Sequence, residues 1–444
     1  MNDQTIYALA SGAGRAGVAV VRLSGPRSFD VLCALSQKGS FKPRYAHRVH
    51  LVDPNTTYPI DDGLVLYFPA PNSFTGEDVV EFQIHGGRAV VQALLDALSS
   101  FNGLRMAEPG EFTRRAFEND KMDLTQAEGL ADLIHAETSA QARQALRQMD
   151  GALGKIYEDW ADRIVRVLAH FEAVIDFPDE DLPEEIELGV REKVRLLQTE
   201  IEAHLGDGHR GERLRDGVRL AIVGPPNAGK SSLLNHLAKR EVAIVSDIAG
   251  TTRDVIESHL DIGGYPVVVA DTAGLRHSED VIESEGIRRA ENTAAQADLK
   301  VVLFDCADWP NLDEKTLDLI DVDSLVVFNK IDKTTKPDVT NIKGQVPLFM
   351  SAKSLDGLDE FFERLEEEVA KRCMMSGSPS LTRARHREAL EDSIEALLRF
   401  SQIDLAELAA EDLRMATRAL GRITGRIDVE DVLDIVFSDF CIGK

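Results

Sequence analysis

The chain has 444 residues, of which 43% are hydrophobic and 28% are charged, so it is long enough for two to four folded domains. Its formal net charge of −26 excludes a general nucleic-acid-binding protein, because phosphate contacts need clustered lysine and arginine, although a local basic patch would still allow a nucleic-acid substrate. No apolar run approaches the ~18 residues of a membrane span, and no signal peptide is recognisable, so we expect a cytoplasmic protein without membrane contact.

The first 120 residues are predicted to mix strands and helices. Residues 79–84, VVEFQI, alternate with the period of a strand, and Gly86 and Gly87 end this pattern. Residues 89–98 then have the apolar spacing of a helix. An α/β domain is therefore expected here.

The next hundred residues are predicted to be mainly helical. Residues 123–172 and 186–205 carry apolar side chains at helical spacing. Between them, residues 176–185, DFPDEDLPEE, are acidic and interrupted by proline, so they are expected to form a loop. The glycine- and charge-rich residues 206–217 are predicted to be a linker.

Beyond this linker the pattern changes twice. Short apolar runs first alternate with helical segments, which is typical of a parallel sheet covered by helices. After about residue 375 the chain returns to helix, with predicted segments at 388–400, 403–421 and 429–437. The simplest architecture is a helical domain interrupted by an inserted α/β domain.

A phosphate-binding loop begins the inserted part. Residues 218–223, VRLAIV, have the pattern of a buried strand, and residues 224–231, GPPNAGKS, match the G-x-x-x-x-G-K-S motif that precedes a helix. Backbone N–H groups in such a loop, together with the helix N-terminus, bind phosphates. Lys230 is expected to reach the β- and γ-phosphates, and the Ser231 hydroxyl is expected to bind magnesium.

Two further motifs belong to the phosphate end of the same site. Residues 250–254, GTTRD, provide Thr252 for magnesium and the γ-phosphate. Residues 271–274, DTAG, follow an apolar run, and Asp271 is expected to hold magnesium through water. The DTAG glycine is expected to sense the γ-phosphate through its amide.

The last two motifs select the base. In the NKID sequence of residues 329–332, the carboxylate of Asp332 matches the paired N–H donors of guanine, which adenine lacks. Residues 351–353, SAK, are expected to back the base. The five motifs in this order predict a GTPase, and the residues predicted to contact GTP are Asn227, Ala228, Gly229, Lys230, Ser231, Ser232, Ser246, Asp247, Ile248, Ala249, Gly250, Thr251, Thr252, Asp271, Thr272, Ala273, Gly274, Asn329, Lys330, Asp332, Ser351, Ala352 and Lys353.

One position departs from the pattern of Ras-like proteins. Leu275 stands where those proteins have the glutamine that orients the attacking water, so hydrolysis is either feeble or assisted by another group. By spacing alone, each acidic residue of the following loop is most simply a solvated charge. The candidates are Glu279, Asp280, Glu283 and Glu285.

Segments outside these motifs resemble a known family. Residues 107–113 read AEPGEFT, residues 115–119 read RAFEN and residues 121–128 read KMDLTQAE, while the chain ends in CIGK at 441–444. They closely resemble the signatures of the MnmE (or TrmE) family of tRNA-modification GTPases. The resemblance covers essentially the whole chain.

The resemblance implies a multidomain fold of α/β and all-α parts. A P-loop GTPase domain, residues 216–374, would be inserted into a helical domain whose two segments are residues 120–215 and 375–444. An N-terminal α/β domain that binds tetrahydrofolate and dimerises would precede them at residues 1–119.

The resemblance also implies the activity and its partners. With the flavoprotein MnmG, members of the family add a carboxymethylaminomethyl or aminomethyl group to the wobble uridine of certain tRNAs. The one-carbon unit comes from a tetrahydrofolate, in its 5-formyl or 5,10-methylene form. The expected cofactors are GTP, Mg²⁺, K⁺ and tetrahydrofolate, and the expected partners are a second copy of the chain in a homodimer, MnmG and tRNA.

Position by position, the resemblance assigns roles in hydrolysis. Glu283 matches the family's catalytic, water-activating glutamate, and Asn227 matches an asparagine that binds potassium. Ser246, Ile248 and Thr251 match the loop that completes the potassium site. A monovalent cation there neutralises charge on the phosphates where an arginine finger would otherwise act.

For folate, the matching positions are Arg22, Glu81, Lys121 and Lys444. Basic groups suit the glutamate tail of the folate, and a carboxylate suits its pterin ring. From the sequence alone, these four residues would look like ordinary surface charges.

Other residues leave alternatives open. Cys441 could act as a nucleophile toward the base or pack as a small apolar residue, and its sequence neighbours supply no base to activate it. The other cysteines are scattered without metal-ligand spacing, so we expect reduced thiols. Contacts to tRNA phosphates, or simple solvation, are the alternatives for Arg114, Arg115, Arg383, Arg385 and Arg387.

Two other functions share part of the pattern. A ribosome-assembly GTPase of the Era or Der kind has a similar G domain, but an RNA-binding domain or a second G domain accompanies it. Here acidic helices and the CIGK end follow instead. A switch that only binds GTP would hydrolyse it slowly and without a potassium effect. The tRNA-modification GTPase is favoured.

Overall fold

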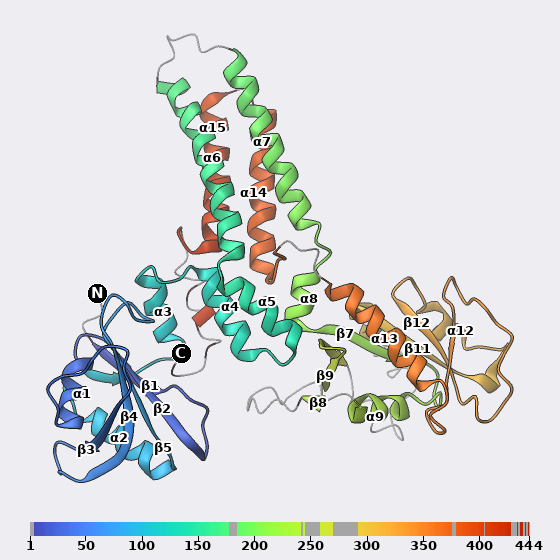
Figure 1. The fold of residues 1–444 in the computed structure, drawn as a ribbon. Coiled ribbons are helices and arrows are strands. Elements are labelled where there is room, and N and C mark those ends of the chain that lie inside the picture. Colours follow the sequence, from blue (N-terminus) through green and yellow to red (C-terminus); the bar gives the residue numbers. More distant parts are fainter. Residues whose placement is uncertain are drawn as a thin grey trace. The chain divides into compact units, whose positions relative to one another are not determined.

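The computed structural model describes residues 4–176, 184–240, 243–244, 258–269, 292–374, 379–403, 405–427 and residues 433, 436, 437, 440 and 443. They belong to two compact units (Figure 1). The first comprises residues 1–131, 148–170 and 413–444, and the second comprises residues 132–147 and 171–412. The long helices α6 (Ala152–Asp176) and α15 (Ala406–Thr424) contribute to both units.

The first unit contains a six-stranded sheet in the order β3-β4-β5-β2-β1-β6. Neighbouring strands are antiparallel except for β1 and β6, which are parallel. The predicted strand at 79–84 lies within β5, where Val80, Phe82 and Ile84 are buried on one face. The strands are β1 (Thr5–Leu9), β2 (Ala16–Ser24), β3 (His47–Val52), β4 (Pro59–Phe68), β5 (Val79–Gly86) and β6 (Leu104–Met106).

Helices α1 (Ser28–Ser36) and α2 (Arg88–Ser99) pack on this sheet and complete its core. The chain then continues through α3 (Glu111–Glu118), α4 (Leu124–His135) and α5 (Ser139–Met149) into α6. The region 123–172, predicted to be helical, is therefore three helices separated by short turns. Most of the predicted 176–185 loop lies outside the described residues.

The C-terminal end of the chain returns to the first unit. The carbonyl oxygen of Phe437 lies so close to Gly110 that a Cβ there would overlap it, and the Phe437 ring centroid is 6.4 Å from that of Phe117. Gly443 has a φ of 104° and packs against the carbonyl oxygen of Leu9, at the end of β1. The two ends of the sequence therefore meet at one sheet.

The second unit contains a seven-stranded sheet in the order β13-β12-β11-β7-β10-β9-β8. The strands are β7 (Val218–Val223), β8 (Ala243–Ile244), β9 (Ser258–Ile262), β10 (Tyr265–Val269), β11 (Leu299–Asp305), β12 (Ser324–Asn329) and β13 (Leu348–Phe349). Apolar side chains cover both faces, with α9 (Lys230–Arg240) and α13 (Leu358–Cys373) on one and the short α12 (Glu314–Asp318) on the other (Figure 1).

The prediction of a parallel sheet is only partly right. The five strands from β13 to β10 are parallel, whereas β9 and β8 add to them in antiparallel pairs. Gly263 and Gly264 join β9 to β10, and both have positive φ, at 61° and 86°. A two-residue turn of this kind connects antiparallel strands directly, so no helix intervenes there.

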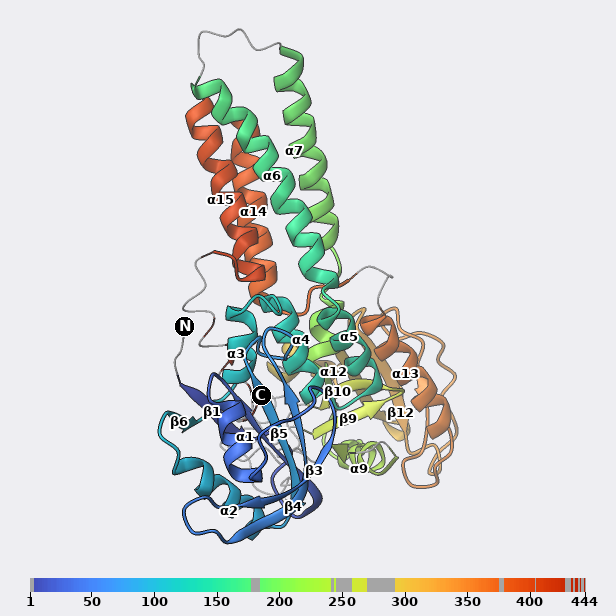
Figure 2. The ribbon, with the colours of Figure 1, turned by 60° about the vertical axis from the view of Figure 1, so that its left-hand side comes forward.

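Two helices that flank this sheet in the sequence pack side by side. They are α7 (Glu184–Leu205) and α14 (Ala384–Gln402), and Figures 1 and 2 both show the pair. The α/β segment is thus an insertion between paired helices, and a second α/β sheet precedes it. The predicted fold class is confirmed.

The prediction that residues 206–217 form a linker is wrong for most of this segment. Residues Arg210–Asp216 form helix α8, in which Gly211 and Leu214 are buried. Glycine and charge are typical of linkers, but here Glu212, Arg213 and Arg215 pair with charged residues elsewhere in the folded chain. Residues 206–209 and Gly217 lie outside helices and strands.

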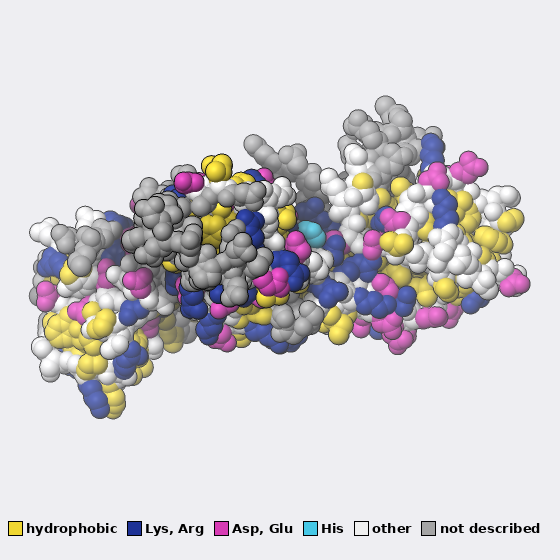
Figure 3. Space-filling view, turned by 90° about the horizontal axis from the view of Figure 1, so that it is seen from above, with side chains coloured by type: hydrophobic (Ala, Val, Ile, Leu, Met, Phe, Trp, Pro, Cys, Tyr) yellow, Lys and Arg dark blue, Asp and Glu magenta, His cyan; other side chains and the backbone are white. Residues whose placement is uncertain are grey.

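The surface is mixed in charge. On the face shown in Figure 3, basic and acidic side chains of the described residues are interspersed. Among the helices that the structure describes, none is long and apolar enough to cross a membrane.

Candidate functional site

The phosphate loop follows β7 and ends at the start of α9. Gly224 and Gly229 have φ values of 154° and 105°, which L side chains rarely adopt. A Cβ at Gly224 would overlap the carbonyl oxygen of Leu303, and one at Gly229 would overlap Nδ2 of Asn329. Close packing therefore requires glycine at both ends of the loop.

Lys230 lies folded into this loop. Its Nζ donates hydrogen bonds of 2.8 Å to the carbonyl oxygens of Gly224 and Pro225, and burial lowers the pKa of the amine. An incoming phosphate would replace these carbonyl partners with a stronger, charged acceptor. Lys230 is thus already directed into the space that the loop encloses.

The mouth of the loop is exposed. Asn227 has a φ of 62° and is exposed, as are Ser231 and Ser232 in the first turn of α9. Ala228 is buried beneath them. A hydroxyl in this position fits magnesium, which prefers oxygen ligands.

Asn329 joins the phosphate loop to the base-binding loops. Its buried side chain donates a hydrogen bond of 2.8 Å to the Ala228 carbonyl oxygen. Its Oδ1 accepts bonds from the backbone nitrogens of Lys330, at 2.8 Å, and Ala352, at 3.0 Å. One amide therefore fixes three motifs that are distant in the sequence.

Asp332, the residue predicted to bind the base, is exposed. Its Oδ1 accepts a hydrogen bond of 2.7 Å from the Ser351 hydroxyl, and this bond holds the pKa of the Asp332 carboxyl below its ordinary value. The Ser351 oxygen in turn accepts from the backbone nitrogen of Lys353 at 3.2 Å. This hydrogen bond orients the carboxylate and favours its charged form, which the predicted role toward guanine needs.

Asp305, at the end of β11, contacts the base-motif residue Lys330, although no sequence motif predicts it. It pairs with Nζ of Lys330 at 2.7 Å, and Lys330 has a φ of 67°. Although burial raises the pKa of Asp305, the hydrogen bonds from Lys330 and from the Ala307 backbone outweigh it and lower the pKa. The sequence does place this aspartate at the carboxyl end of a buried strand, and ligands of parallel sheets bind at that end.

The remaining predicted nucleotide residues lie outside the described residues. They are the potassium and magnesium loop with Ser246, Asp247, Ile248, Ala249, Gly250, Thr251 and Thr252, the DTAG residues Asp271, Thr272, Ala273 and Gly274, and the catalytic candidate Glu283.

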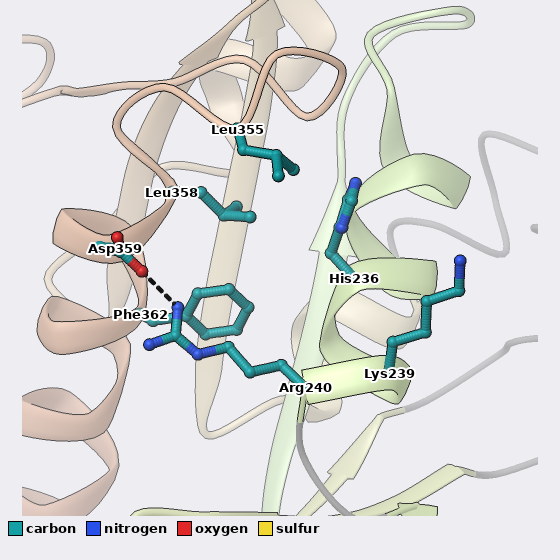
Figure 4. A pocket seen from close by; sticks show the side chains of 7 residues that line it. All are labelled: His236, Lys239, Arg240, Leu355, Leu358, Asp359 and Phe362. Carbon is teal, nitrogen blue, oxygen red and sulfur yellow. Dashed lines mark hydrogen bonds and ion pairs between the residues drawn. The ribbon is translucent and has the colours of Figure 1, made fainter.

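A cavity of about 330 Å³ lies beside the base loop, between α9 and α13 (Figure 4). Arg240 ends α9, where it pairs with Asp359 at 2.6 Å and lies over the Phe362 ring at 4.4 Å. His236, also in the lining, donates from Nε2 to the Ala352 carbonyl oxygen at 2.7 Å. The lining of the cavity contains no residue of the phosphate loop, but one lining residue, His236, is hydrogen-bonded to the SAK segment.

The folate candidates Arg22 and Glu81 form an ion pair in the first unit. They face each other on β2 and β5, and Nε and Nη2 of Arg22 donate to Oε1 of Glu81 at 3.0 and 2.9 Å. The guanidinium also lies over the rings of Phe74 and Phe112, with its carbon 5.4 and 5.7 Å from their centroids. The two aromatic residues were not predicted from the sequence.

Lys121 and the C-terminal end approach the same strands. Cε of Lys121 lies over Gly76, two residues after Phe74. Gly443 contacts Leu9 at the end of β1, and the preceding residue, Ala8, pairs with Arg22 of β2. Lys444 and Cys441 themselves lie outside the described residues.

The arginines considered for tRNA contact have protein partners. Arg115 is buried and pairs with Glu77 and Glu111 at 3.0 Å each. Arg114 pairs with Glu118 at 3.2 Å on the exposed side of α3. In the second unit, Arg383 pairs with Asp132 at 2.8 Å and Arg387 with Asp207 at 3.0 Å. Simple solvation is therefore wrong for these two arginines and for Arg115.

Comparison with known proteins identifies the family. A family model described as the MnmE helical domain matches residues 124–441, and one described as the GTP-binding protein TrmE N-terminus matches residues 5–121. This chain belongs to the MnmE family. The resemblance inferred from the AEPGEFT and CIGK segments is therefore confirmed.

Curated MnmE relatives match the chain over its whole length. The tRNA modification GTPase MnmE of Paramagnetospirillum magneticum is 57% identical over 443 residues, covering 100% of both chains. That of Parvibaculum lavamentivorans is 55% identical over 449 residues, covering 99% of this chain and 100% of its own. The mitochondrial 5-taurinomethyluridine-[tRNA] synthase subunit GTPB3 of Danio rerio is 49% identical over 469 residues, covering 100% and 93%. The MnmE family is one of tRNA modification GTPases, so the predicted enzyme class is confirmed.

Proposed function

We propose that this chain is a potassium-activated GTPase that, with the flavoprotein MnmG, adds a carboxymethylaminomethyl or aminomethyl group to the wobble uridine of certain tRNAs. Family membership over the entire chain is the observation that carries the proposal. The bacterial relatives are named for tRNA modification, and the fish relative for a modified uridine in tRNA. The name of the fish relative agrees with a uridine substrate.

In the proposed hydrolytic site, Lys230 binds the β- and γ-phosphates, and Ser231 and Thr252 bind magnesium. Potassium, held by Asn227, Ser246, Ile248 and Thr251, would neutralise charge that develops on the phosphates. Glu283 would position and deprotonate the attacking water, because Leu275 has no group for this task. The exposure of Asn227 and Ser231 at the mouth of the loop supports their two roles.

For the base, Asp332 would accept the two N–H groups of guanine. The hydrogen bond from Ser351, which orients the carboxylate and favours its charged form, supports this role. Asn329 would bind the nucleotide indirectly, by holding the phosphate loop and the SAK segment at a fixed distance.

The folate pocket is proposed to use Arg22, Glu81, Lys121 and Lys444. Both hydrogen bonds from Arg22 go to Oε1 of Glu81, so Oε2 could accept N–H groups of a pterin ring. Phe74 and Phe112 would add apolar contact beside the guanidinium. The folate would supply the one-carbon unit, and two copies of the chain would form a homodimer through residues 1–119.

Mass spectrometry of wobble nucleosides tests the proposal. Cells that lack this chain should lose the modified uridine, and the intact gene should restore it. Complementation by an Asp332→Asn variant should fail, because the variant cannot select GTP. Unchanged nucleosides in the deletion strain would refute the proposal.

A further inference from the structure

Helix α8 lies between the strand that carries the phosphate loop and the helix pair α7–α14 (Figure 1). Asp216 ends the helix, Gly217 follows with a φ of 93°, and β7 then leads directly to the loop. A Cβ on Gly217 would lie 2.7 Å from Cγ2 of Val268, so this connection is closely packed. A single residue therefore separates α8 from the strand that leads to the phosphate loop.

One carboxylate holds α8 to the sheet. Oδ1 of Asp298 accepts a hydrogen bond of 2.7 Å from Nε of Arg213, and Oδ2 accepts one of 2.9 Å from the backbone nitrogen of Arg219. The carbonyl oxygen of Asp298 accepts from Nε of Arg372 at 2.9 Å. Asp298 therefore joins α8, β7 and α13 at the end of β7 opposite the phosphate loop.

One arginine holds α8 to the helix pair. Arg387 of α14 donates from Nη1 to the carbonyl oxygen of Leu205, the last residue of α7, at 2.9 Å. Its Nη2 pairs with Asp207 at 3.0 Å and its Nε with Glu212 at 3.2 Å, and all three side chains are largely buried. Arg387 therefore joins α14, the end of α7 and α8.

The backbone of α8 is also in close contact with this side. A Cβ on Gly211 would overlap the carbonyl oxygen of Leu381, just before α14. Asp132 accepts from Nε of Arg215 at 3.0 Å and from Nη2 of Arg383 at 2.8 Å. Glycine at 211 and the shared carboxylate fix the distance between α8 and the start of α14.

We propose that α8 is a rigid joint that transmits the state of the nucleotide site to the helix pair α7–α14. Its positioning contacts are Arg213 with Asp298 on the sheet side and Arg387 with Asp207 and Glu212 on the helix side. A helix of seven residues is not stable alone in water, so these contacts set its position. The two contacts act in series, so the loss of either one interrupts the coupling between the helices and the sheet. The further step, that this joint couples GTP hydrolysis to tRNA modification, rests on the proposed function.

The test uses Arg213→Gln, Arg387→Gln and the double variant of the full-length chain. Lys343→Gln is the control, because Lys343 forms an exposed ion pair of 2.9 Å with Asp318 at the end of α12. GTP hydrolysis, modification of wobble uridine with MnmG present, and thermal unfolding are measured for each. We expect wild-type GTP hydrolysis, but modification lowered about tenfold or more, within the range of measured coupling between sites. The double variant should be no worse than either single variant, because the contacts act in series.

Hydrogen exchange provides a readout that does not depend on tRNA. In the wild type, replacing GDP by a GTP analogue should change the protection of amides at 198–216 and 381–390. In Arg213→Gln this response should disappear from both segments, and Arg213→Lys, which keeps a charged donor, should partly restore it. If the wild type shows no such response, or if a folded Arg213→Gln variant keeps both the response and the modification, α8 is not the joint. Failure of the wild type to modify tRNA, with the exchange response intact, would instead refute the proposed function alone.

Discussion

The side chain of Asn329 donates a hydrogen bond of 2.8 Å to the carbonyl oxygen of Ala228, 101 residues earlier in the chain. The base-binding end of the nucleotide site is thereby anchored to its phosphate-binding end. Because the same amide accepts from Lys330 and Ala352, the distance between the two ends depends on one buried residue.

Asn329→Ala should weaken GTP binding and lower stability. The change leaves the backbone groups of Ala228, Lys330 and Ala352 without their partner, and each such loss costs about 1–3 kcal/mol when the group stays buried. Fluorescent-nucleotide titration and thermal unfolding measure the two effects. Asn235→Ala, on the exposed side of α9, is the control and should change neither. Wild-type affinity in a folded Asn329→Ala protein would contradict this role.

GTP turnover should depend on potassium far more than on sodium. The reason is that Asn227 and the 246–251 loop are proposed to hold a cation in place of an arginine finger. Asn227→Ala should remove most of the potassium stimulation and leave nucleotide binding largely intact. Steady-state hydrolysis in matched potassium and sodium salts is the measurement, and equal rates in both salts for the wild type would end the idea.

Glu283→Ala should lower turnover by ~10²-fold or more, as for the loss of a general base, with little change in GTP affinity. Glu285→Ala, two residues away with the same charge, is the matched control and should retain activity. Single-turnover hydrolysis separates this effect from nucleotide binding. A Glu283→Ala variant with normal turnover would mean that another group activates the water.

Asp332→Asn should shift preference from GTP toward XTP, because the exocyclic oxygen of xanthine can accept from an amide. Competition between the two nucleotides measures the shift, and a variant that keeps GTP over XTP would argue against Asp332 as the base reader. The hydrogen bond from Ser351 lowers the pKa of Asp332, so the charged form persists below the usual aspartate range. GTP binding by the wild type should therefore persist, as far as this group is concerned, to a lower pH than an ordinary aspartate would allow.

Deletion of residues 441–444 should weaken binding of 5-formyl-tetrahydrofolate and abolish tRNA modification. Gly443 packs against Leu9 beside the strand pair that carries Arg22, which supports a role for the terminal Lys444 in that pocket. GTP hydrolysis should survive, because residues 218–353 are unchanged. Calorimetric titration of the folate decides the matter: an unchanged affinity would mean that the last residues are not part of the pocket.

The sequence by itself determined the nucleotide motifs and the family. The phosphate loop is local, since a buried strand, a glycine-rich turn and a helix follow one another within about twenty residues, and their patterns are sufficient to predict them. The Gly263–Gly264 turn was equally local and could have predicted the antiparallel β9–β10 pair. The AEPGEFT and CIGK segments identified the family because they are long and lie outside the shared GTPase motifs.

Only the tertiary structure decided which charges act together. Arg22 and Glu81 are 59 residues apart, and Arg387 and Asp207 are 180 residues apart, so nothing in local spacing marks them as partners. The residues 206–217 have the composition of a linker, yet α8 forms there because Asp298 and Arg387 hold it from two sides. A helix as short as α8 is stable only through contacts with the rest of the fold. The partners of its charged side chains come from distant parts of the chain, so the sequence alone does not predict the helix.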